Sequence, residues 1–278
     1  MAFETWVLTS KSEYRTTIRW FGSSETCSLS AMILYRGVEK PDRMVVSLYM
    51  GWRHVLFANW PIDPDLVEPH LPERLTLDTY DGHAWLSVVP FTNVDVRPRI
   101  FPRGTGLPLP ELNLRTYVTH DGTPGVYFFS LDADGIVAVM GARLFHHLPY
   151  YYAKIDLSVE SDGIRFTSRR RHPGARPVQF EATYGSSGER ENAAPGTLAH
   201  FLTERYRYYT EAPDGSIRYA NVQHDPWPLY DAVVDIEKNT LFAANGFSTP
   251  DTEPVHLYSP SVETTASKSR RVPTTSSP

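Results

Sequence analysis

Residues 112–131 read LNLRTYVTHDGTPGVYFFSL, two β-rich runs joined by Asp121-Gly122. Asp-Gly supplies the positive φ angles of a type I′ turn, which joins neighbouring antiparallel strands. The same dipeptide separates β-rich runs at Asp81-Gly82, Asp162-Gly163 and Asp214-Gly215. Because every such connection is short and local, the sequence predicts antiparallel hairpins and argues against a doubly wound parallel sheet.

The predicted strands flank these turns. Their ranges are 75–80 with 84–94, 112–119 with 125–131, 155–160 with 164–170, and 206–210 with 217–222, and a further strand spans 178–184. Three helices are predicted between them. Asp63-Pro64 begins the first, which runs to about His70, Asp134 or Gly135 opens the second, and Thr197 begins the third. In the second helix we expect Val137, Met140, Ala142 and Leu144 to be buried, and the helix to end before Pro149.

Roughly ten strands and three helices around one core predict an α+β protein. The expected architecture is an antiparallel β-barrel, closed or half-closed, with about three flanking helices. Residues 44–259 carry this pattern. We expect residues 1–43 to be a poorly ordered N-terminal extension or a misassigned start, and residues 260–278, rich in Ser, Thr and Pro, to be a disordered tail.

The composition excludes several classes of protein. Hydrophobic residues make up 41% of the 278 residues, and the net charge of −5 argues against nucleic acid as the main partner. The single cysteine, Cys27, excludes an internal disulfide framework. The chain has neither a long apolar run nor the pattern of a signal peptide, which predicts a soluble, cytoplasmic protein without a membrane partner.

Common cofactor and catalytic motifs are missing from the sequence. There is no glycine-rich phosphate loop, no His-Glu-x-x-His and no Gly-x-Ser-x-Gly. His146 and His147 are adjacent, so on a helix their side chains diverge by about 100° and do not readily share a metal. We therefore expect no metal and no cofactor.

Two strand segments carry residues that could perform chemistry. Alternation places Glu111, Asn113, Arg115 and Tyr117 on one strand face, which either meets water or lines a polar cavity. An Arg beside a carboxylate on such a face could clamp an acidic substrate. Arg205 lies in a segment that mixes charges with aromatics and could face inward.

The second segment follows Pro149. Alternation places Tyr150, Tyr152 and Lys154 on one face of the strand. If that face lines an interior, burial lowers the pKa of the Lys154 amine, as a Schiff-base nucleophile requires. If it meets solvent, the tyrosines only pack around the core. The residues alone leave both readings open.

The chain resembles the YqjF-like domain of unknown function over roughly residues 51–259. The motifs that carry the resemblance are Asn59–Pro64, Leu71–Leu75, Asp81–Trp85, Pro90-Phe91, Pro110–Tyr117, Gly125–Asp132, Leu148–Tyr151, Phe201–Tyr206 and His224–Pro228. That family is related to acetoacetate decarboxylase, so the resemblance implies a cone-shaped antiparallel β-barrel with flanking helices. It also implies that Glu111 occupies the place of an active-site glutamate.

The resemblance fails at the residues that define decarboxylase chemistry. The decarboxylase has a Schiff-base lysine and a second lysine after a proline that resembles Pro149, and the matching positions here are Tyr150 and Tyr151. A phenol cannot form an imine. We therefore expect a small-molecule-binding barrel acting on, or only binding, a carbonyl, carboxylate or phenolic compound.

Two alternatives stay open: a Schiff-base enzyme that uses Lys154, and a non-catalytic ligand-sensing or structural protein. A homo-oligomer is also left open. The candidate catalytic residues are Glu111, Arg115, Tyr150 and Lys154, and the candidate substrate-binding residues are Asn113, Tyr117, Tyr152 and Arg205.

Overall fold

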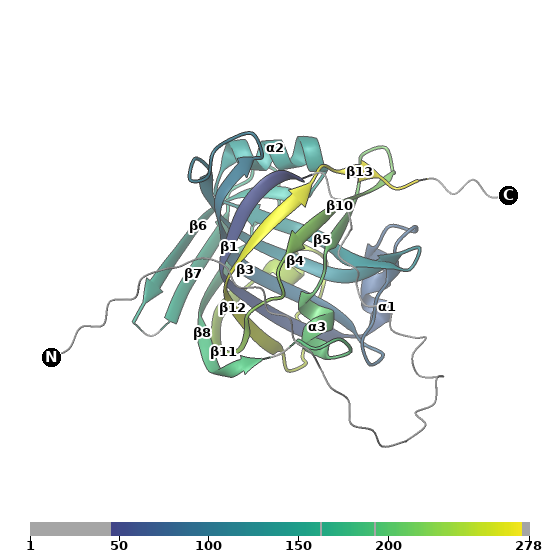
Figure 1. Cartoon of the computed structure of the whole chain (residues 1–278). Coiled ribbons are helices and arrows are strands. Elements are labelled where there is room, and N and C mark those ends of the chain that lie inside the picture. Colours follow the sequence, from purple (N-terminus) through teal and green to yellow (C-terminus); the bar gives the residue numbers. More distant parts are fainter. Residues whose placement is uncertain (1–45, 162, 192, 274–278) are drawn as a thin grey trace, which may run out of the picture. The chain divides into compact units, whose positions relative to one another are not determined.

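Strands dominate the structure, which is of the α+β class (Figure 1). The computed structural model describes residues 46–161, 163–191 and 193–273, so the expectation for residues 1–43 lies outside the described residues. The strands are β1 (Val46–Ile62), β2 (Thr76–Leu77), β3 (Ala84–Pro98), β4 (Leu107–His120), β5 (Thr123–Ala133), β6 (Tyr150–Glu160), β7 (Gly163–Arg170), β8 (Gln179–Glu191), β9 (Arg207–Glu211), β10 (Ile217–His224), β11 (Leu229–Asn239), β12 (Val255–Ser267) and β13 (Arg270–Arg271). The helices are α1 (Pro64–Val67), the 3₁₀ helix η2 (Glu68–His70), α2 (Ile136–His146), α3 (Leu198–Thr203) and α4 (Leu241–Ala244).

Three of the four predicted hairpins are confirmed. β4 pairs antiparallel with β5, β6 with β7, and β9 with β10. Asp121 and Gly122 have φ angles of 48° and 72°, the left-handed values that a type I′ turn requires. The fourth prediction is wrong in its pairing. Tyr80 and His83 form only an isolated bridge, whereas β3 pairs with β1 and β4.

The strand pairings close into rings. Among the described residues, one ring runs β5–β6–β7–β8–β11–β12–β1–β3–β4 and returns to β5. A second ring shares β5, β4, β3, β1 and β12 with the first and is completed by β9 and β10. The pairs β5–β6 and β5–β9 are parallel, which corrects the expectation of purely antiparallel pairing. Helix α2 supplies the crossover that the parallel pair β5–β6 requires.

The shared strands present different faces to the two rings. Leu112 and Leu114 of β4 pack with Phe166 of β7 in the apolar core of the nine-strand ring. The alternate β4 residues Glu111 and Arg115 line a cavity on the opposite face. Because side chains alternate along a strand, one strand can build the core and the cavity at once.

The predicted helices begin where expected, and α4 was not predicted. Asp63 and Thr197 each act as an N-cap and accept a hydrogen bond from a backbone N–H of the first turn, which satisfies a donor that the helix leaves unpaired. Burial of the apolar residues of α2 is wrong for Met140 and Leu144, whose exposed fractions are 65% and 69%. Of the helices within the described ranges, none has both the length and the apolar character needed to cross a membrane.

The prediction of a disordered tail from residue 260 is wrong as far as residue 273. β12 continues to Ser267 and pairs with β1 and, near its end, with β10. Val262, Thr264 and Ala266 are buried in alternation with more exposed neighbours. The segment looks like low complexity by composition, but its buried residues recur with the period of two that a strand requires. Residues 274–278 lie outside the described part.

Replacing Val262 with Ala is expected to lower the free energy of unfolding by about 2 kcal/mol, because the substitution opens space in a packed cluster. Ser261→Ala is the matched control, since Ser261 is exposed on the other face of β12. Its effect should stay below about 0.5 kcal/mol. Urea denaturation of both variants measures the difference, and a negligible effect of Val262→Ala would contradict the strand.

Candidate functional site

A cavity of about 700 Å³ lies inside the second ring of strands, and α2 contributes Ala138, Ala142 and Phe145 to its lining. Its apolar lining includes Leu48, Trp52, Phe91, Val126, Phe145 and Trp227. Its polar lining includes Glu111, Arg115, Tyr150, Arg205, Arg207 and Lys268. A mainly apolar cavity of this size with a few convergent polar groups is typical of sites for small organic molecules.

Glu111 is the buried carboxyl group of this cavity, with 4% of its surface exposed. Asn93 Nδ2 donates to Glu111 Oε2 at 3.3 Å, and Asn113 Nδ2 donates to Oε1 at 3.3 Å. Burial raises the pKa of Glu111 from 4.5 to about 7, although the hydrogen bonds and the nearby Arg115 guanidinium act in the opposite direction. Glu111 can therefore both donate and accept a proton near neutral pH.

Asn113 is arranged so that it can serve either protonation state of Glu111. Its Oδ1 atom is buried and has no hydrogen-bond partner among the described residues, while its Nδ2 atom faces the carboxylate. Exchanging the oxygen and nitrogen of this amide would place an acceptor against Glu111 Oε1. A proton on Oε1 would then be donated to Asn113. The amide can thus follow the charge of the carboxyl group.

Tyr150 reaches Glu111 across an intervening strand. Glu111 of β4 lies opposite Ala133 of β5, and Leu131 of β5 lies opposite Tyr150 of β6. The phenol of Tyr150 spans β5 and donates a hydrogen bond to Glu111 Oε2 at 2.7 Å. Burial, together with the charge of Glu111, raises the pKa of Tyr150 well above 10, so the phenol remains a donor at neutral pH.

Arg115 brings a positive charge to the same cavity wall. Its Nη2 atom donates to the carbonyl of Leu202 at 3.1 Å, and its guanidinium lies 5.4 Å from the centre of the Phe57 ring. Arg115 forms no ion pair with a carboxylate among the described residues. A bound anionic group would supply the missing counter-charge, and a guanidinium favours a planar carboxylate.

Tyr117 and Arg205 occupy supporting positions. Tyr117 is fully buried behind the cavity wall, and its hydroxyl donates at 2.9 Å to the same Leu202 carbonyl that holds Arg115. Arg205 lines the cavity, but its Nη1 atom is paired with Asp78 at 2.6 Å. Tyr117 therefore positions the carbonyl beneath Arg115, and the charge of Arg205 is already matched.

The structure does not bring Tyr152 and Lys154 into the cavity. The neighbours of Lys154 on β6, Ala153 and Ile155, pack in the apolar core of the nine-strand ring. Lys154 itself is exposed on the opposite face, and neither it nor Tyr152 lines the cavity. Of the two readings left open for this face, the structure agrees with the one in which Lys154 meets solvent. The candidate Lys154 therefore lies outside the cavity, because this face of β6 meets the cavity only at Tyr150.

The cavity residues that were not predicted from the sequence include Asn93, His146, Tyr208 and Lys268. The hydroxyl of Tyr208 lies 2.5 Å from His146 Nδ1. Asn93 reaches Glu111 only because β3 lies beside β4, which no local pattern reveals. Lys268 comes directly after β12, in the segment that the composition assigned to a disordered tail.

Comparisons with known proteins agree with the fold. Residues 49–263 match the family DUF2071, described as "Uncharacterized conserved protein (COG2071)". The chain is 40% identical over 224 residues to "Uncharacterized protein YqjF" of Bacillus subtilis (strain 168), a match that covers 80% of this chain and 91% of that protein.

Solved structures with the same fold are more distant in sequence. Acetoacetate decarboxylase from Legionella pneumophila is similar with a TM-score of 0.56 at 14% identity, covering 90% of this chain and 98% of the other. The enduracididine biosynthesis enzyme MppR complexed with pyruvate has a TM-score of 0.54 at 15% identity, covering 87% and 93%. These likenesses describe the fold, whereas the family match and the relative at 40% identity establish kinship. The chain belongs to the DUF2071 family.

Proposed function

We propose that this protein is an enzyme that binds a small carbonyl- or carboxylate-bearing compound in the cavity and moves a proton with Glu111 and Tyr150. The observation that carries the proposal is the buried Glu111, whose pKa of about 7 lies at the operating pH of a general acid or base. Tyr150 supplies a second proton donor 2.7 Å from the carboxyl group. Proton transfer next to a carbonyl needs no imine and no lysine.

The charge of the cavity supports an acidic ligand. Arg115 is cationic, and burial raises the pKa of its neighbour Glu111 to about 7, which favours the uncharged form of that carboxyl group. A carboxylate on the ligand would pair with the Arg115 guanidinium, while the apolar walls would hold the rest of the molecule. Two structural relatives are consistent with this class, since one is named for acetoacetate and another was solved with pyruvate.

The direct test is exchange of carbon-bound hydrogen for deuterium, followed by proton NMR, with a panel of small keto acids in heavy water. An enzyme of this type catalyses the exchange at the carbon next to the carbonyl even when its complete reaction is unknown. Binding of the same compounds is followed by the shift of the melting temperature. Binding without exchange would favour the non-catalytic, ligand-sensing alternative. The absence of both binding and exchange would exclude the proposal.

Arg115→Met is expected to weaken binding of an acidic ligand by roughly 10- to 100-fold, because the variant loses a charge-assisted hydrogen bond. The uncharged amide analogue of the same ligand should bind the variant and the native protein similarly. Arg165→Met, at an exposed arginine paired with Glu237, is the matched control and should bind normally. Isothermal titration calorimetry measures the affinity of the native protein and of both variants for the acid and for its amide. Equal loss for acid and amide would contradict a carboxylate contact at Arg115.

A Schiff-base reaction is a second candidate function, with Lys268 in place of Lys154 as the lysine that would form the imine. Lys268 lines the cavity, whereas Lys154 does not. Borohydride trapping with the keto-acid panel, followed by mass spectrometry, separates the two mechanisms. An adduct on Lys268 would favour the imine route, and deuterium exchange that persists in Lys268→Met would favour the route through Glu111.

Two further expectations belong to the same proposal. We infer that the ring of nine strands is the cone-like barrel of the acetoacetate decarboxylase fold, with the ligand cavity on the outer face of its shared strands. A cytoplasmic location fits an enzyme that acts on small metabolites and has no disulfide framework.

A further inference from the structure

Large apolar side chains are exposed at one end of the molecule. Ten large hydrophobic residues within the described ranges have high exposure, and seven of them belong to only two segments. The first segment is α2, and the second is the connection between β3 and β4 together with Leu107, the first residue of β4. The seven residues, called the apolar end below, are Ile100, Phe101, Leu107, Ile136, Met140, Leu144 and Phe145. A patch of this kind indicates an interaction site, because isolated surface residues rarely cluster so strongly.

Helix α2 is apolar on two sides. Ala138 and Ala142 face the cavity. Ile136, Met140 and Leu144 follow one another at intervals of four residues and point outward, with exposed fractions between 57% and 69%. The cavity accounts for the inner side of the helix, but no described residue covers the outer stripe. The outer stripe therefore needs its own explanation.

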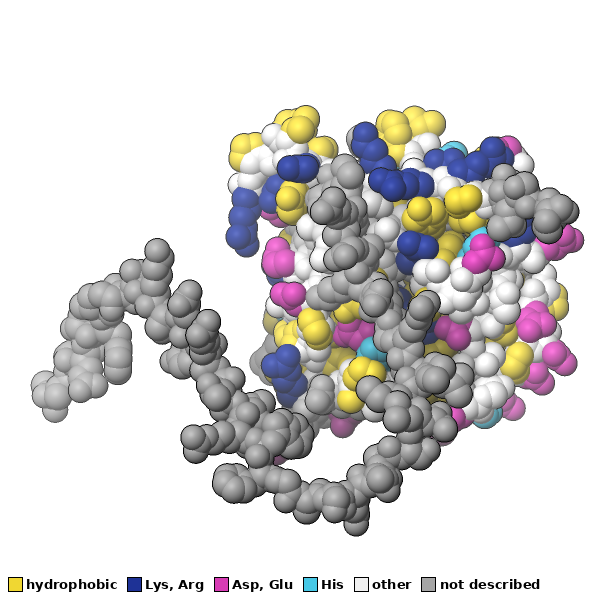
Figure 2. Space-filling view, turned by 45° about the vertical axis from the view of Figure 1, so that its right-hand side comes forward, with side chains coloured by type: hydrophobic (Ala, Val, Ile, Leu, Met, Phe, Trp, Pro, Cys, Tyr) yellow, Lys and Arg dark blue, Asp and Glu magenta, His cyan; other side chains and the backbone are white. Residues whose placement is uncertain are grey.

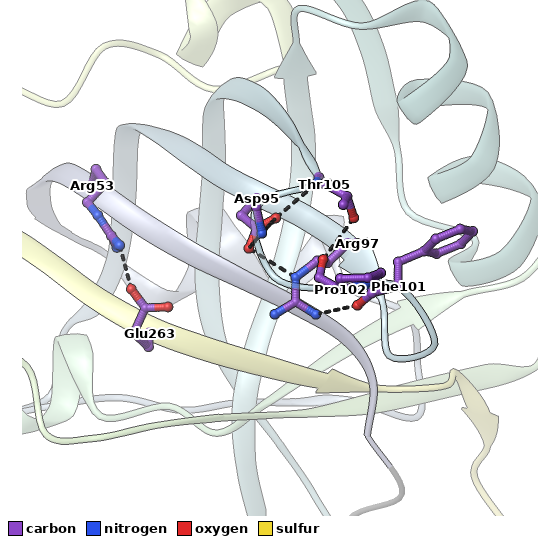
Figure 3. Close-up of polar contacts among 9 residues, drawn as sticks. Arg53, Asp95, Arg97, Phe101, Pro102, Thr105 and Glu263 are labelled. Carbon is purple, nitrogen blue, oxygen red and sulfur yellow. Dashed lines mark hydrogen bonds and ion pairs between the residues drawn. The ribbon is translucent and has the colours of Figure 1, made fainter.

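The β3–β4 connection displays its apolar residues from an ordered framework (Figure 3). Asp95 accepts hydrogen bonds from the backbone N–H groups of Gly104 and Gly106 and from Arg97, and Arg97 in turn donates to the carbonyl of Phe101 at 3.0 Å. In Figure 3 the Phe101 ring projects away from this network. The loop is thus held in a shape that exposes Phe101 and its neighbour Ile100, which is 85% exposed.

The two segments lie next to each other. A Cβ atom added at Gly135, just before α2, would lie 2.8 Å from Leu109 Cδ1 in the first residues of β4. The backbone N–H of Asp134 donates to the carbonyl of Pro110 at 3.2 Å. Figure 2 shows hydrophobic and basic side chains together along the upper edge, the end at which Figure 1 has α2. The two segments that carry the seven residues therefore adjoin at this end of the molecule.

The charge of this surface is opposite to that of the whole chain. Residues 96–110 and 136–147 contain no Asp or Glu, while the chain has a net charge of −5. Arg97 is paired with Asp95. Arg99, Arg103 and Arg143 are exposed and form no ion pair with a described residue. Arg143 donates from Nη1 to the carbonyl of Tyr150 at 2.8 Å, so its guanidinium is already engaged. Exposed arginines around apolar residues, here Arg99 and Arg103, complement a surface that is apolar inside and anionic outside.

We propose that the apolar end docks on the surface of an anionic phospholipid membrane. The apolar side chains would enter the boundary between headgroups and acyl chains, and Arg99 and Arg103 would contact the phosphate groups. This contact differs from the absence of a membrane partner that the sequence predicts, because a peripheral contact requires no apolar run in the sequence. The contact does not involve Glu111 or Tyr150, and Phe145 of α2 belongs both to the apolar end and to the cavity lining.

Sedimentation of the full chain with phospholipid vesicles tests the proposal. We expect binding to vesicles of phosphatidylcholine with phosphatidylglycerol, and much weaker binding to phosphatidylcholine alone or at high salt. The double variant Ile100→Asp with Met140→Asp should lower the affinity roughly tenfold or more, since it removes two apolar side chains from the contact. Circular dichroism and the melting temperature verify that the variant is folded.

The matched control adds the same two charges elsewhere. Val159 and Val233 are exposed apolar residues outside the apolar end, with 65% and 68% of their surface exposed. Val159→Asp with Val233→Asp should bind vesicles as the native chain does. Equal losses in both double variants, or no binding of the native chain to anionic vesicles, would overturn the proposal. A third outcome would also overturn the proposal: the native chain binds no vesicles but forms a dimer, and only Ile100→Asp with Met140→Asp dissociates that dimer. The surface would then belong to a contact with a second copy of the chain.

Discussion

Arg170→Ala is expected to lower the free energy of unfolding by about 3–5 kcal/mol, because it leaves a buried carboxylate without its counter-charge. Arg170 Nε donates to Asp132 Oδ1 at 2.7 Å, and the side chains are only 3% and 0% exposed. The guanidinium also lies 4.1 Å from the centre of the Tyr151 ring. Few other single substitutions remove a partner from so completely buried a charge.

The effect of Arg170→Ala should depend on pH. Burial raises the pKa of Asp132 from 3.8 to about 6, even though Arg170 opposes the shift. A raised pKa means that the folded state holds its proton more tightly, so the stability contributed by Asp132 is complete below pH 4 and is lost as the pH rises through the folded pKa. Without Arg170 that pKa rises further. The deficit of the variant should therefore be larger at pH 8 than at pH 5.

Guanidinium chloride denaturation at the two pH values measures this difference. Arg165→Ala is the matched control, because Arg165 is 46% exposed and its 3.7 Å ion pair with Glu237 is solvated. It should cost no more than about 1 kcal/mol at either pH. Replacing both partners, as in Asp132→Asn with Arg170→Met, should cost less than Arg170→Ala alone, since no unpaired charge remains. A deficit independent of pH would contradict the assignment to Asp132.

The sequence predicts the local parts of the site and misses the parts that depend on strand order. Alternation on β4 correctly separates Glu111 and Arg115 from Leu112 and Leu114, because the pleat of a strand is a local property. Alternation on β6 does not predict whether Lys154 lies in the cavity, because one face of a strand can line a cavity at its first residue and meet solvent further along. Which neighbours a strand meets is decided by pairing far along the chain.

Composition misleads at two further places. The Ser- and Thr-rich end of the chain forms β12, since Val262, Thr264 and Ala266 find a buried face between β1 and β10. The apolar residues of α2 are not all buried, because hydrophobicity alone does not distinguish a face that packs on the core from one that stays exposed. Positions at which an apolar residue is exposed, or a polar one buried, are where functional residues are expected.

Glu111→Gln is expected to stabilise the folded protein at alkaline pH while it removes proton transfer. The pKa of Glu111 is 4.5 ordinarily and about 7 in the folded state. The stability that Glu111 contributes is therefore complete below pH 4.5 and is lost as the pH rises to about 7. The loss amounts to about 3 kcal/mol. Glutamine carries no charge at any pH, so the variant should escape this loss.

The hydrogen bonds around Glu111 can accommodate the amide. The oxygen of the new glutamine would accept from Tyr150 and Asn93, which now donate to Oε2. Its nitrogen would face Asn113, whose buried and unpaired Oδ1 becomes the acceptor once that amide is turned. Turning the amide moves Asn113 Nδ2 to the position where Oδ1 has no partner, a cost that the variant shares with the protonated native side chain. At pH 8 the variant should thus be more stable than the native protein by up to about 3 kcal/mol, and at pH 4 the two should be similar.

Thermal and urea denaturation between pH 4 and pH 8 measure the change, with Glu253→Gln as the control at an exposed carboxylate. Glu253→Gln should follow the native profile. In the proposed enzyme, the same Glu111→Gln variant should lose roughly 10²- to 10⁴-fold in the rate of deuterium exchange, because a general acid or base contributes that much. A gain in stability joined to a loss of exchange identifies a carboxyl group kept in the cavity for its chemistry, at a cost to the fold. If stability rises but the exchange rate does not fall, the raised pKa of Glu111 is supported and its catalytic role is contradicted. If the dependence of stability on pH is the same as in the native protein, the raised pKa itself is contradicted.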